Sequence, residues 1–382
     1  MSGKEPRRTA FWVTLCVLMA LAVESASWAF FRFYGEERLH YHIKVDERLF
    51  AEEVLNAPAA KLPGPTFHRV MGWDEIPVNS NLPEPFALAS RNEPSSPGKT
   101  GVSVYGDSFT YCQDVADDET WPHYLGELSA TGVANFGARG YGPDQALLKL
   151  ELDLNAGRHA KIVILSALSE NIARIVNVNP RFYWAEGSAY GFKPVLVEEN
   201  GVFSWKGDYL ENLSTPEGRA SALDAVEKYD FWRDYNRRRP TIGFPYSVSL
   251  IQTSKYLLFD VKRWEDLWKE ERPVKTMRAV VDRFVALGKE NGFTPVLLFI
   301  PEIADLKRYQ RNGKMSYAEF AGSLKTAYGQ SGLVVVDIAE ERFDPASFNI
   351  TPYSGHASAY GNKIIAGAVF RKIGPFLRQP AR

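Results

Sequence analysis

The stretch VSVYGDSFT (residues 102–110) decides the fold class of this chain. Its first half is an apolar run typical of a buried strand, and Gly106 ends that run. A glycine directly before Asp-Ser lets the backbone turn sharply at the carboxyl end of a strand. The turn leaves the hydroxyl of Ser108 in the crevice where open α/β sheets bind ligands. The stretch therefore predicts a strand that ends in an exposed serine.

Apolar strands alternate with helices in two regions of the chain. Strands are predicted over residues 102–106, 133–136, 161–167, 294–300 and 333–337. Helices are predicted over residues 120–129, 144–155, 273–290, 317–328 and 358–376. This alternation predicts a mainly parallel sheet covered by helices on both faces, a three-layer α/β/α sandwich.

Two segments interrupt the alternation. Residues from about 174 to 272 form a long aromatic-rich insertion, either a solvated helical cap with a charged face or a lid or groove that shapes a substrate site. Residues 34–99 are polar and punctuated by Pro and Gly, which predicts an irregular stalk or wrapping segment. The α/β domain is expected to cover residues 100–382.

The N-terminal 33 residues predict a membrane-directed segment. Lys4, Arg7 and Arg8 precede an apolar run over residues 10–23, and the apolar character resumes after Glu24. We favour an uncleaved membrane anchor over a signal peptide cleaved near Ser-Ala-Ser at 25–27. In both cases the basic end stays in the cytoplasm, so we expect a single-pass inner-membrane protein with its C-terminal domain in the periplasm.

Composition excludes several classes of function. The chain has 382 residues, and its 45 basic and 46 acidic side chains leave a net charge of -1, which gives no reason to expect nucleic acid as a partner. Its two cysteines exclude a disulfide framework, and neither has the spacing of a zinc site. We therefore expect no metal and no cofactor.

Further polar residues follow the other predicted strands. Gly140 ends the tract NFGARG, Asn171 ends the tract SEN, and His356 stands just before the last helix. Because the carboxyl ends of parallel strands share one edge of the sheet, we expect these residues to converge on Ser108. Alternative roles are open for each: Ser108 as a turn or cap residue, Gly140 as a turn glycine, Asn171 as a helix cap, and His356 as a surface residue.

The four blocks, in this order, resemble the SGNH hydrolase superfamily of GDSL-like esterases and lipases, in a membrane-anchored bacterial branch. The resemblance covers residues 101–172 and about 293–377, and it implies a flavodoxin-like sandwich. It further implies that Ser108 is the nucleophile and His356 the base. The N–H groups of Ser108 and Gly140 and the side-chain amide of Asn171 would then hold the oxyanion. Arg174, near the same turn as Asn171, is either a substrate-binding residue or a salt-bridged surface residue.

One departure from the superfamily bears on activity. The Asp that normally lies three residues before the His is Tyr353 here. Three outcomes follow: a Ser-His dyad oriented by a backbone carbonyl or by Ser354, an acid supplied from elsewhere such as Asp344, or loss of turnover.

These features together predict an exported serine esterase that acts on acyl esters, acetyl esters above all, of an acylated small molecule or envelope polysaccharide. The same site would also suit an O-acyltransferase on polysaccharide. A catalytically silent carbohydrate-binding or assembly protein is the third possibility, favoured by the missing Asp and the aromatic insertion.

Overall fold

The computed structural model describes residues 5–35, 39, 42, 44–57, 66–77, 89–91, 100–184, 191–329, 332–350 and 355–377. A five-stranded sheet in which all neighbouring strands run parallel forms its centre. In spatial order the strands are β4 (Gly132–Asn135), β3 (Thr100–Tyr105), β5 (Ile162–Leu168), β8 (Thr294–Ile300) and β9 (Val334–Asp337). The predicted parallel sheet is confirmed.

The strand order places the predicted serine at the point where the sheet changes direction of winding. β3 comes first of the five in the chain yet lies between the second and the third, which is the flavodoxin-like order. Val104, near the carboxyl end of β3, is in register with Asn135 on one side and Ile164 on the other. Ligands of such sheets bind in the crevice beyond the carboxyl ends of the two strands that flank this switch point. Those strands are β3 and β5.

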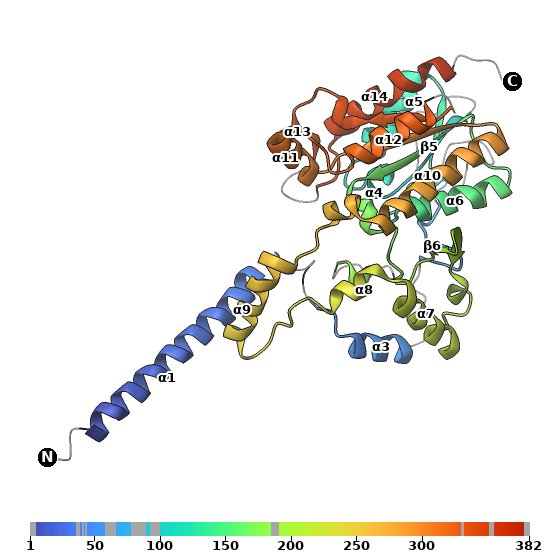
Figure 1. The fold of residues 1–382 in the computed structure, drawn as a ribbon. Coiled ribbons are helices and arrows are strands. Elements are labelled where there is room, and N and C mark those ends of the chain that lie inside the picture. The colour runs from blue at the N-terminus through green and yellow to red at the C-terminus, as the bar shows by residue number, and fades with distance from the viewer. Residues whose placement is uncertain are drawn as a thin grey trace.

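Helices cover both faces of the sheet, as predicted. α5 (Trp121–Ser129) and α14 (Ala359–Leu377) pack on each other over one face, while α6 (Pro143–Asn155) and α10 (Glu271–Asn291) cover the other (Figure 1). Six of the seven residues of β8 are buried, which is why it reads as one continuous apolar run rather than an alternating one.

The insertion folds into a hairpin and several helices that are tied to the α/β domain. Its elements are β6 (Val195–Glu199), β7 (Val202–Lys206), α7 (Pro216–Tyr229), α8 (Phe231–Asn236) and α9 (Tyr246–Lys255). The buried ammonium of Lys193 lies 2.6 Å from the buried carboxylate of Asp144 in α6. Because an unpaired buried charge is costly, this ion pair fixes how the insertion docks.

The N-terminal part of the chain contains a projecting helix and a segment that packs on the body. α1 (Glu5–Phe30) projects away from the α/β domain (Figure 1). A candidate span, Arg8–Gly35, is 28 residues long, and none of its most apolar window is buried. Downstream, α3 (Glu47–Asn56) and the hairpin of β1 (Phe67–His68) and β2 (Gly72–Trp73) lie against the body. The described parts of residues 34–99 therefore wrap the domain.

Candidate active site

The turn after β3 presents Ser108 at the start of a short helix, α4 (Ser108–Tyr111). A side chain at Gly106 would come within 2.2 Å of the hydroxyl oxygens of both Ser166 and Thr110, so the turn requires glycine. The carboxylate of Asp107 caps α4 by accepting the N–H of Phe109 at 2.9 Å. The close packing around Gly106 and the cap formed by Asp107 thus fix the position of Ser108.

His356 lies near the C-terminal end of the chain, and its side chain contacts Ser108. Its Nε2 lies 3.0 Å from the Ser108 hydroxyl oxygen, and its Nδ1 lies 2.8 Å from a carboxylate oxygen of Asp114. The ring of Phe109 packs against the imidazole, with 5.0 Å between the ring centres. A serine, a histidine and an acid are therefore joined in one hydrogen-bonded chain, the arrangement of a nucleophile, its base and the group that orients the base.

Asp114 is the acid that sequence reasoning missed. The loop after α4 passes through left-handed backbone conformations at Cys112 (φ 60°) and Asp114 (φ 75°), which turn the Asp114 carboxylate toward His356. Asp is among the residues that tolerate this conformation best. An acid other than the one absent at position 353 therefore lies against Nδ1 of His356, which is the arrangement of the second of the three outcomes.

The acid suggested earlier, Asp344, has another role. It caps α13 (Pro345–Phe348), where its carboxylate accepts the N–H of Ala346 at 3.0 Å and the hydroxyl of Ser347 at 2.5 Å. These hydrogen bonds, that of Ser347 first, lower its pKa. Tyr353 and Ser354, which the orientation hypotheses also named, lie outside the described residues.

An arginine from the N-terminal segment holds the loop that carries Asp114. Arg91 is buried, and its guanidinium lies 2.8 Å from the Asp117 carboxylate and donates to the carbonyl of Tyr111 at 2.9 Å. It also donates to the carbonyls of Cys112 and Val115. One side chain thus contacts four residues that lie before and after Asp114 in the sequence.

Gly140 lines the same cavity as Ser108 and His356. Its φ of 78° is a conformation that favours glycine. Among the described residues, no acceptor is found for the backbone N–H of either Ser108 or Gly140. Two such N–H groups beside a nucleophile are what an oxyanion hole requires.

Asn171 lies below the cavity wall rather than in it. It is buried, its side-chain oxygen accepts the N–H of Leu168 at 3.0 Å, and its amide nitrogen lies 3.0 Å from the Asp107 carboxylate. A second, longer contact of 3.4 Å joins that nitrogen to Glu170. Asn171 therefore ties the end of β5 to the turn beneath Ser108, and its role in the oxyanion hole stays a prediction.

Arg174 lines the cavity and is held by partners on several sides. Its guanidinium lies 2.8 Å from the Glu170 carboxylate and 3.8 Å from that of Asp107, and it stacks on the Trp184 ring. Burial lowers the pKa of Arg174, but Glu170 and Asp107 more than offset this and raise it above its usual value. The predicted contact of Arg174 with substrate stays a prediction.

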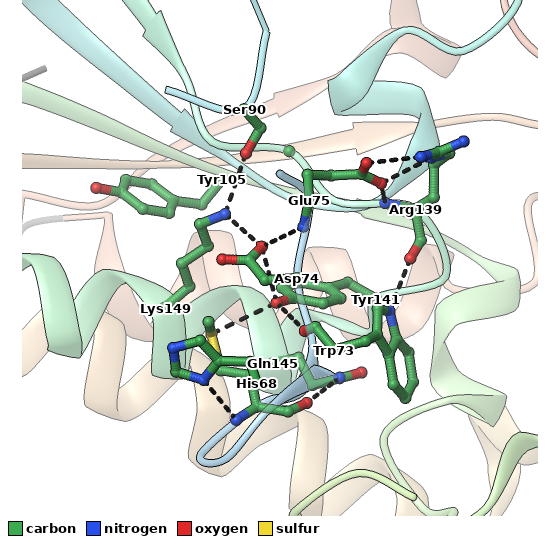
Figure 2. Close-up of polar contacts among 12 residues, drawn as sticks. His68, Trp73, Asp74, Glu75, Ser90, Tyr105, Arg139, Tyr141, Gln145 and Lys149 are labelled. Atoms are coloured by element: carbon green, nitrogen blue, oxygen red, sulfur yellow. Dashed lines mark hydrogen bonds and ion pairs between the residues drawn. The ribbon is translucent and has the colours of Figure 1, made fainter. Parts of the chain in front are cut away.

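Residues 73–75 form hydrogen bonds with both neighbours of Gly140, Arg139 and Tyr141 (Figure 2). The Glu75 carboxylate takes two hydrogen bonds of 2.7 Å from the Arg139 guanidinium and one of 3.0 Å from the Arg139 backbone N–H. The Trp73 indole donates to the Arg139 carbonyl at 2.9 Å, and the Tyr141 hydroxyl donates to the Trp73 carbonyl at 2.7 Å. The residues before and after Gly140 are thus both fixed by a segment that precedes the α/β domain.

A second layer of contacts holds this segment to α6. The Lys149 ammonium lies 2.6 Å from the Asp74 carboxylate and 3.0 Å from the Ser90 hydroxyl (Figure 2). The Gln145 amide donates to the Met71 carbonyl at 2.8 Å. The hydrogen bonds to the Gly140 loop come from residues about 65 positions away from Gly140 in the sequence. No local sequence pattern therefore predicts that residues 73–75 hold the Gly140 loop.

The cavity beside Ser108 has a volume of about 1020 Å³, and charged side chains line much of it. One wall is α11 (Ile303–Asn312), which follows β8. The basic residues of the lining are Arg174, Arg263, Lys307, Arg308 and Arg311, and the acidic ones are Glu170, Glu265 and Glu302. This lining, apart from Arg174, was not predicted from the sequence.

No protein-family model and no curated protein matches the chain. Solved structures do. A protein assigned to the lipolytic G-D-S-L family from Desulfitobacterium hafniense is 14% identical, with 72% of this chain and 99% of that one covered and a TM-score of 0.37. A family 3 carbohydrate esterase from Clostridium thermocellum is 12% identical, with coverages of 75% and 100% and a TM-score of 0.36. The salicylyl-acyltransferase SsfX3 of a tetracycline pathway is 12% identical, with coverages of 75% and 57% and a TM-score of 0.32.

We expect Asp114→Asn to lower kcat by roughly two to four powers of ten, because an amide neither holds the Nδ1 proton reliably nor stabilises the imidazolium. KM should change little, since Asp114 lies behind the histidine. Steady-state hydrolysis of 4-nitrophenyl acetate measures both constants. Asp344→Asn is the matched control, and it should retain kcat. Equal losses of kcat in the two variants would show that Asp114 does not act on His356 during catalysis.

We expect Glu75→Ala to lower kcat by roughly tenfold to a hundredfold, because it frees the loop that carries one oxyanion donor. Glu75→Gln, which keeps one acceptor oxygen, should recover part of this loss. Glu53→Ala, which removes a surface ion pair with Arg181 from the same N-terminal segment, serves as the control. A purely structural role would instead show as a lower unfolding temperature with kcat of the folded enzyme unchanged.

Proposed function

We propose that this protein is a serine esterase or acyltransferase of the SGNH type, in which Ser108, His356 and Asp114 form the catalytic triad. The observation that carries the proposal is the unbroken chain of contacts of 3.0 Å and 2.8 Å through the two nitrogens of His356. Such a chain activates a serine for attack on an ester carbonyl.

In the proposed mechanism the Ser108 oxygen attacks the acyl carbon, and its proton passes to Nε2 of His356. Asp114 holds the proton on Nδ1 and stabilises the imidazolium that forms. The N–H groups of Ser108 and Gly140 bind the oxyanion, with the Asn171 amide as a third donor in exchange for its longer contact with Glu170. His356 then protonates the leaving alcohol and leaves an acyl-serine.

The acyl-serine is resolved by water in an esterase and by a hydroxyl of the acceptor in a transferase, with His356 taking the proton in both. The choice depends on water exclusion and acceptor binding. A complete triad favours either enzyme over a catalytically silent binding protein, since binding alone needs no acid behind the histidine.

We propose further that the enzyme is exported and stays anchored in the inner membrane through Arg8–Gly35. Length and composition suit a span. The basic residues on its N-terminal side place that end in the cytoplasm, and the α/β domain then lies in the periplasm.

The charge of the cavity supports an acidic carrier for the acyl group, such as a polysaccharide that contains sugar acids. Two of the five cations are paired, Arg174 with Glu170 and Arg308 with Glu265 at 2.6 Å. Within the described part of the chain, the side chains of Arg263, Lys307 and Arg311 have no carboxylate partner, although the backbone N–H of Arg263 donates to Asp266. An anionic substrate would supply one.

Glu302, the third acid of the lining, has a raised pKa. Burial, together with the nearby carboxylates of Glu170 and Asp305, raises the pKa of Glu302 well above its usual value. Its Oε1 is buried without a hydrogen-bond partner among the described residues. A raised pKa favours the protonated form of Glu302, whose O–H can donate to a sugar oxygen. The five cations of the lining outnumber its three acids in either protonation state.

Ser108→Ala should abolish covalent labelling by a fluorophosphonate and enzymatic turnover of 4-nitrophenyl acetate, because both require the activated hydroxyl of Ser108. Labelling of purified protein, read by mass spectrometry, measures the first. Ser323→Ala, at a surface serine of α12 (Ala318–Tyr328), controls for nonspecific labelling. Full activity of the Ser108 variant would overturn the proposed nucleophile.

The double change Lys307→Glu and Arg311→Glu should lower kcat/KM for an acetylated oligogalacturonide by about tenfold or more relative to an acetylated xylo-oligosaccharide, because two unpaired cations become anions. Added salt should likewise lower the ratio of kcat/KM of the wild type for the galacturonide over the xylo-oligosaccharide, because it screens the charges. Lys314→Glu, just beyond α11 and outside the lining, is the control. An unchanged ratio of the two substrates would contradict an acidic carrier.

A further inference from the structure

The end of the insertion exposes an apolar surface that the proposed chemistry does not use. Phe244, Ile251, Leu258 and Phe259 are each between 70% and 80% exposed. They belong to α9, to residues 241–245 before it, and to η8 (Tyr256–Asp260), a π-helical segment that continues it. Every other large apolar side chain of the described body is less than 70% exposed. A concentration of this kind marks a binding surface.

The opposite face of α9 is buried. Ser249, Thr253 and Tyr256, spaced by four and three residues, form a shielded stripe along the helix. α9 packs beside the half of α1 nearer the body (Figure 1). Ser27 of α1 and Phe31 of η1 (Phe31–Gly35), which follows α1 directly, are buried, whereas most large side chains of residues 10–23 are exposed. The apolar surface of α9 is therefore continuous with that of α1.

Glu24, the one acid within the apolar part of α1, caps α9. Its carboxylate accepts the backbone N–H of Ser247 at 3.0 Å and that of Tyr246 as well. Position 245, before the first residue of α9, is a proline without a capping side chain. The acid thus satisfies the first N–H groups of a neighbouring helix and gains the favourable potential of its N-terminus.

We propose that α9, with the turn before it and η8 after it, dips into the leaflet that faces the body and forms a second membrane element beside α1. The inference rests on the proposed anchor. Backbone N–H groups in hydrocarbon must have an acceptor within the protein, and Glu24 provides it where water cannot. This requirement explains an acid in a membrane-directed helix and an apolar outer face on α9.

The position of Glu24 along α1 fits this depth. The 14 residues from 10 to 23 rise about 21 Å as a helix. A hydrocarbon core of about 30 Å then extends past Glu24 toward Phe31, so the start of α9 lies inside the leaflet and its end near the surface. Cleavage at 25–27 would remove Glu24 and leave α9 without its cap, which argues for an uncleaved anchor.

The consequence for the site is proximity to the membrane. Arg263, which lines the cavity, follows the end of η8 by three residues. A membrane-embedded α9 therefore holds the cavity mouth close to the bilayer surface, where an envelope polymer would be met.

Nitroxide labels at Phe244→Cys and Ile251→Cys test the proposal in the full chain. The background is Cys16→Ser, since the other cysteine, Cys112, is buried. The protein is reconstituted into phosphatidylethanolamine and phosphatidylglycerol vesicles, and accessibility to oxygen and to a water-soluble nickel complex is read by electron paramagnetic resonance. Val202→Cys, at an apolar position 66% exposed on the body, is the matched control.

We expect labels at 244 and 251 to be several-fold less accessible to nickel and more accessible to oxygen than the label at 202. Adding Glu24→Ala should move the label at 244 toward the aqueous values, while Ser25→Ala should not and the spectrum at 202 should stay constant. Aqueous values at 244 and 251 in membrane-bound protein would overturn the proposal. Shielding from both reagents with coupling between labels would also overturn it, since a second copy would then cover α9. Failure of the protein to remain with the vesicles would reject the anchor itself and leave the catalytic proposal intact.

Discussion

The carboxyl edge of the parallel sheet is the constraint on which the site depends. All five strands end at this edge, so residues that follow different strands meet there without being near in sequence. Ser108 follows the first strand and His356 comes after the last, 248 positions later, yet their side chains are 3.0 Å apart. Gly106 makes this possible, because any side chain there would collide with the hydroxyls of Ser166 and Thr110.

The proposed chemistry does not need its acid on the loop of the histidine, because His356 requires only an anionic acceptor at Nδ1. Which element supplies it is secondary. The position of the acid after α4 has a structural cost, since Asp114 must adopt a left-handed backbone conformation on a partly exposed loop. Arg91 offsets that cost by binding the carbonyls around it. The acid and its supporting arginine therefore form one unit, although they belong to different segments.

The strands and helices could be predicted from the sequence because each is bounded and strongly periodic or apolar, as in the run over residues 294–300 that became β8. Ser108, Gly140 and His356 could be brought together by topology alone. Asp114 could not be identified, because it stands in an acidic run with Asp117, Asp118 and Glu119 and only the turn after α4 selects one of them. Trp73 and Glu75 could not be assigned either, since their effect on the Gly140 loop is made across 64 to 66 positions.

Ion pairs between residues far apart in the sequence determine how the outer segments attach to the sandwich. Lys149 pairs with Asp74 of the N-terminal segment, and Asp144 pairs with Lys193 of the insertion, each at 2.6 Å and both from α6. Apolar contacts tolerate a shift of a few ångströms, whereas a buried charge left without its partner costs several kcal/mol, on the order of 3–5. The pairs therefore select one docking geometry for each segment. Because the same N-terminal segment holds both neighbours of Gly140, the precision of the proposed oxyanion hole follows from ion pairs that lie outside the catalytic blocks.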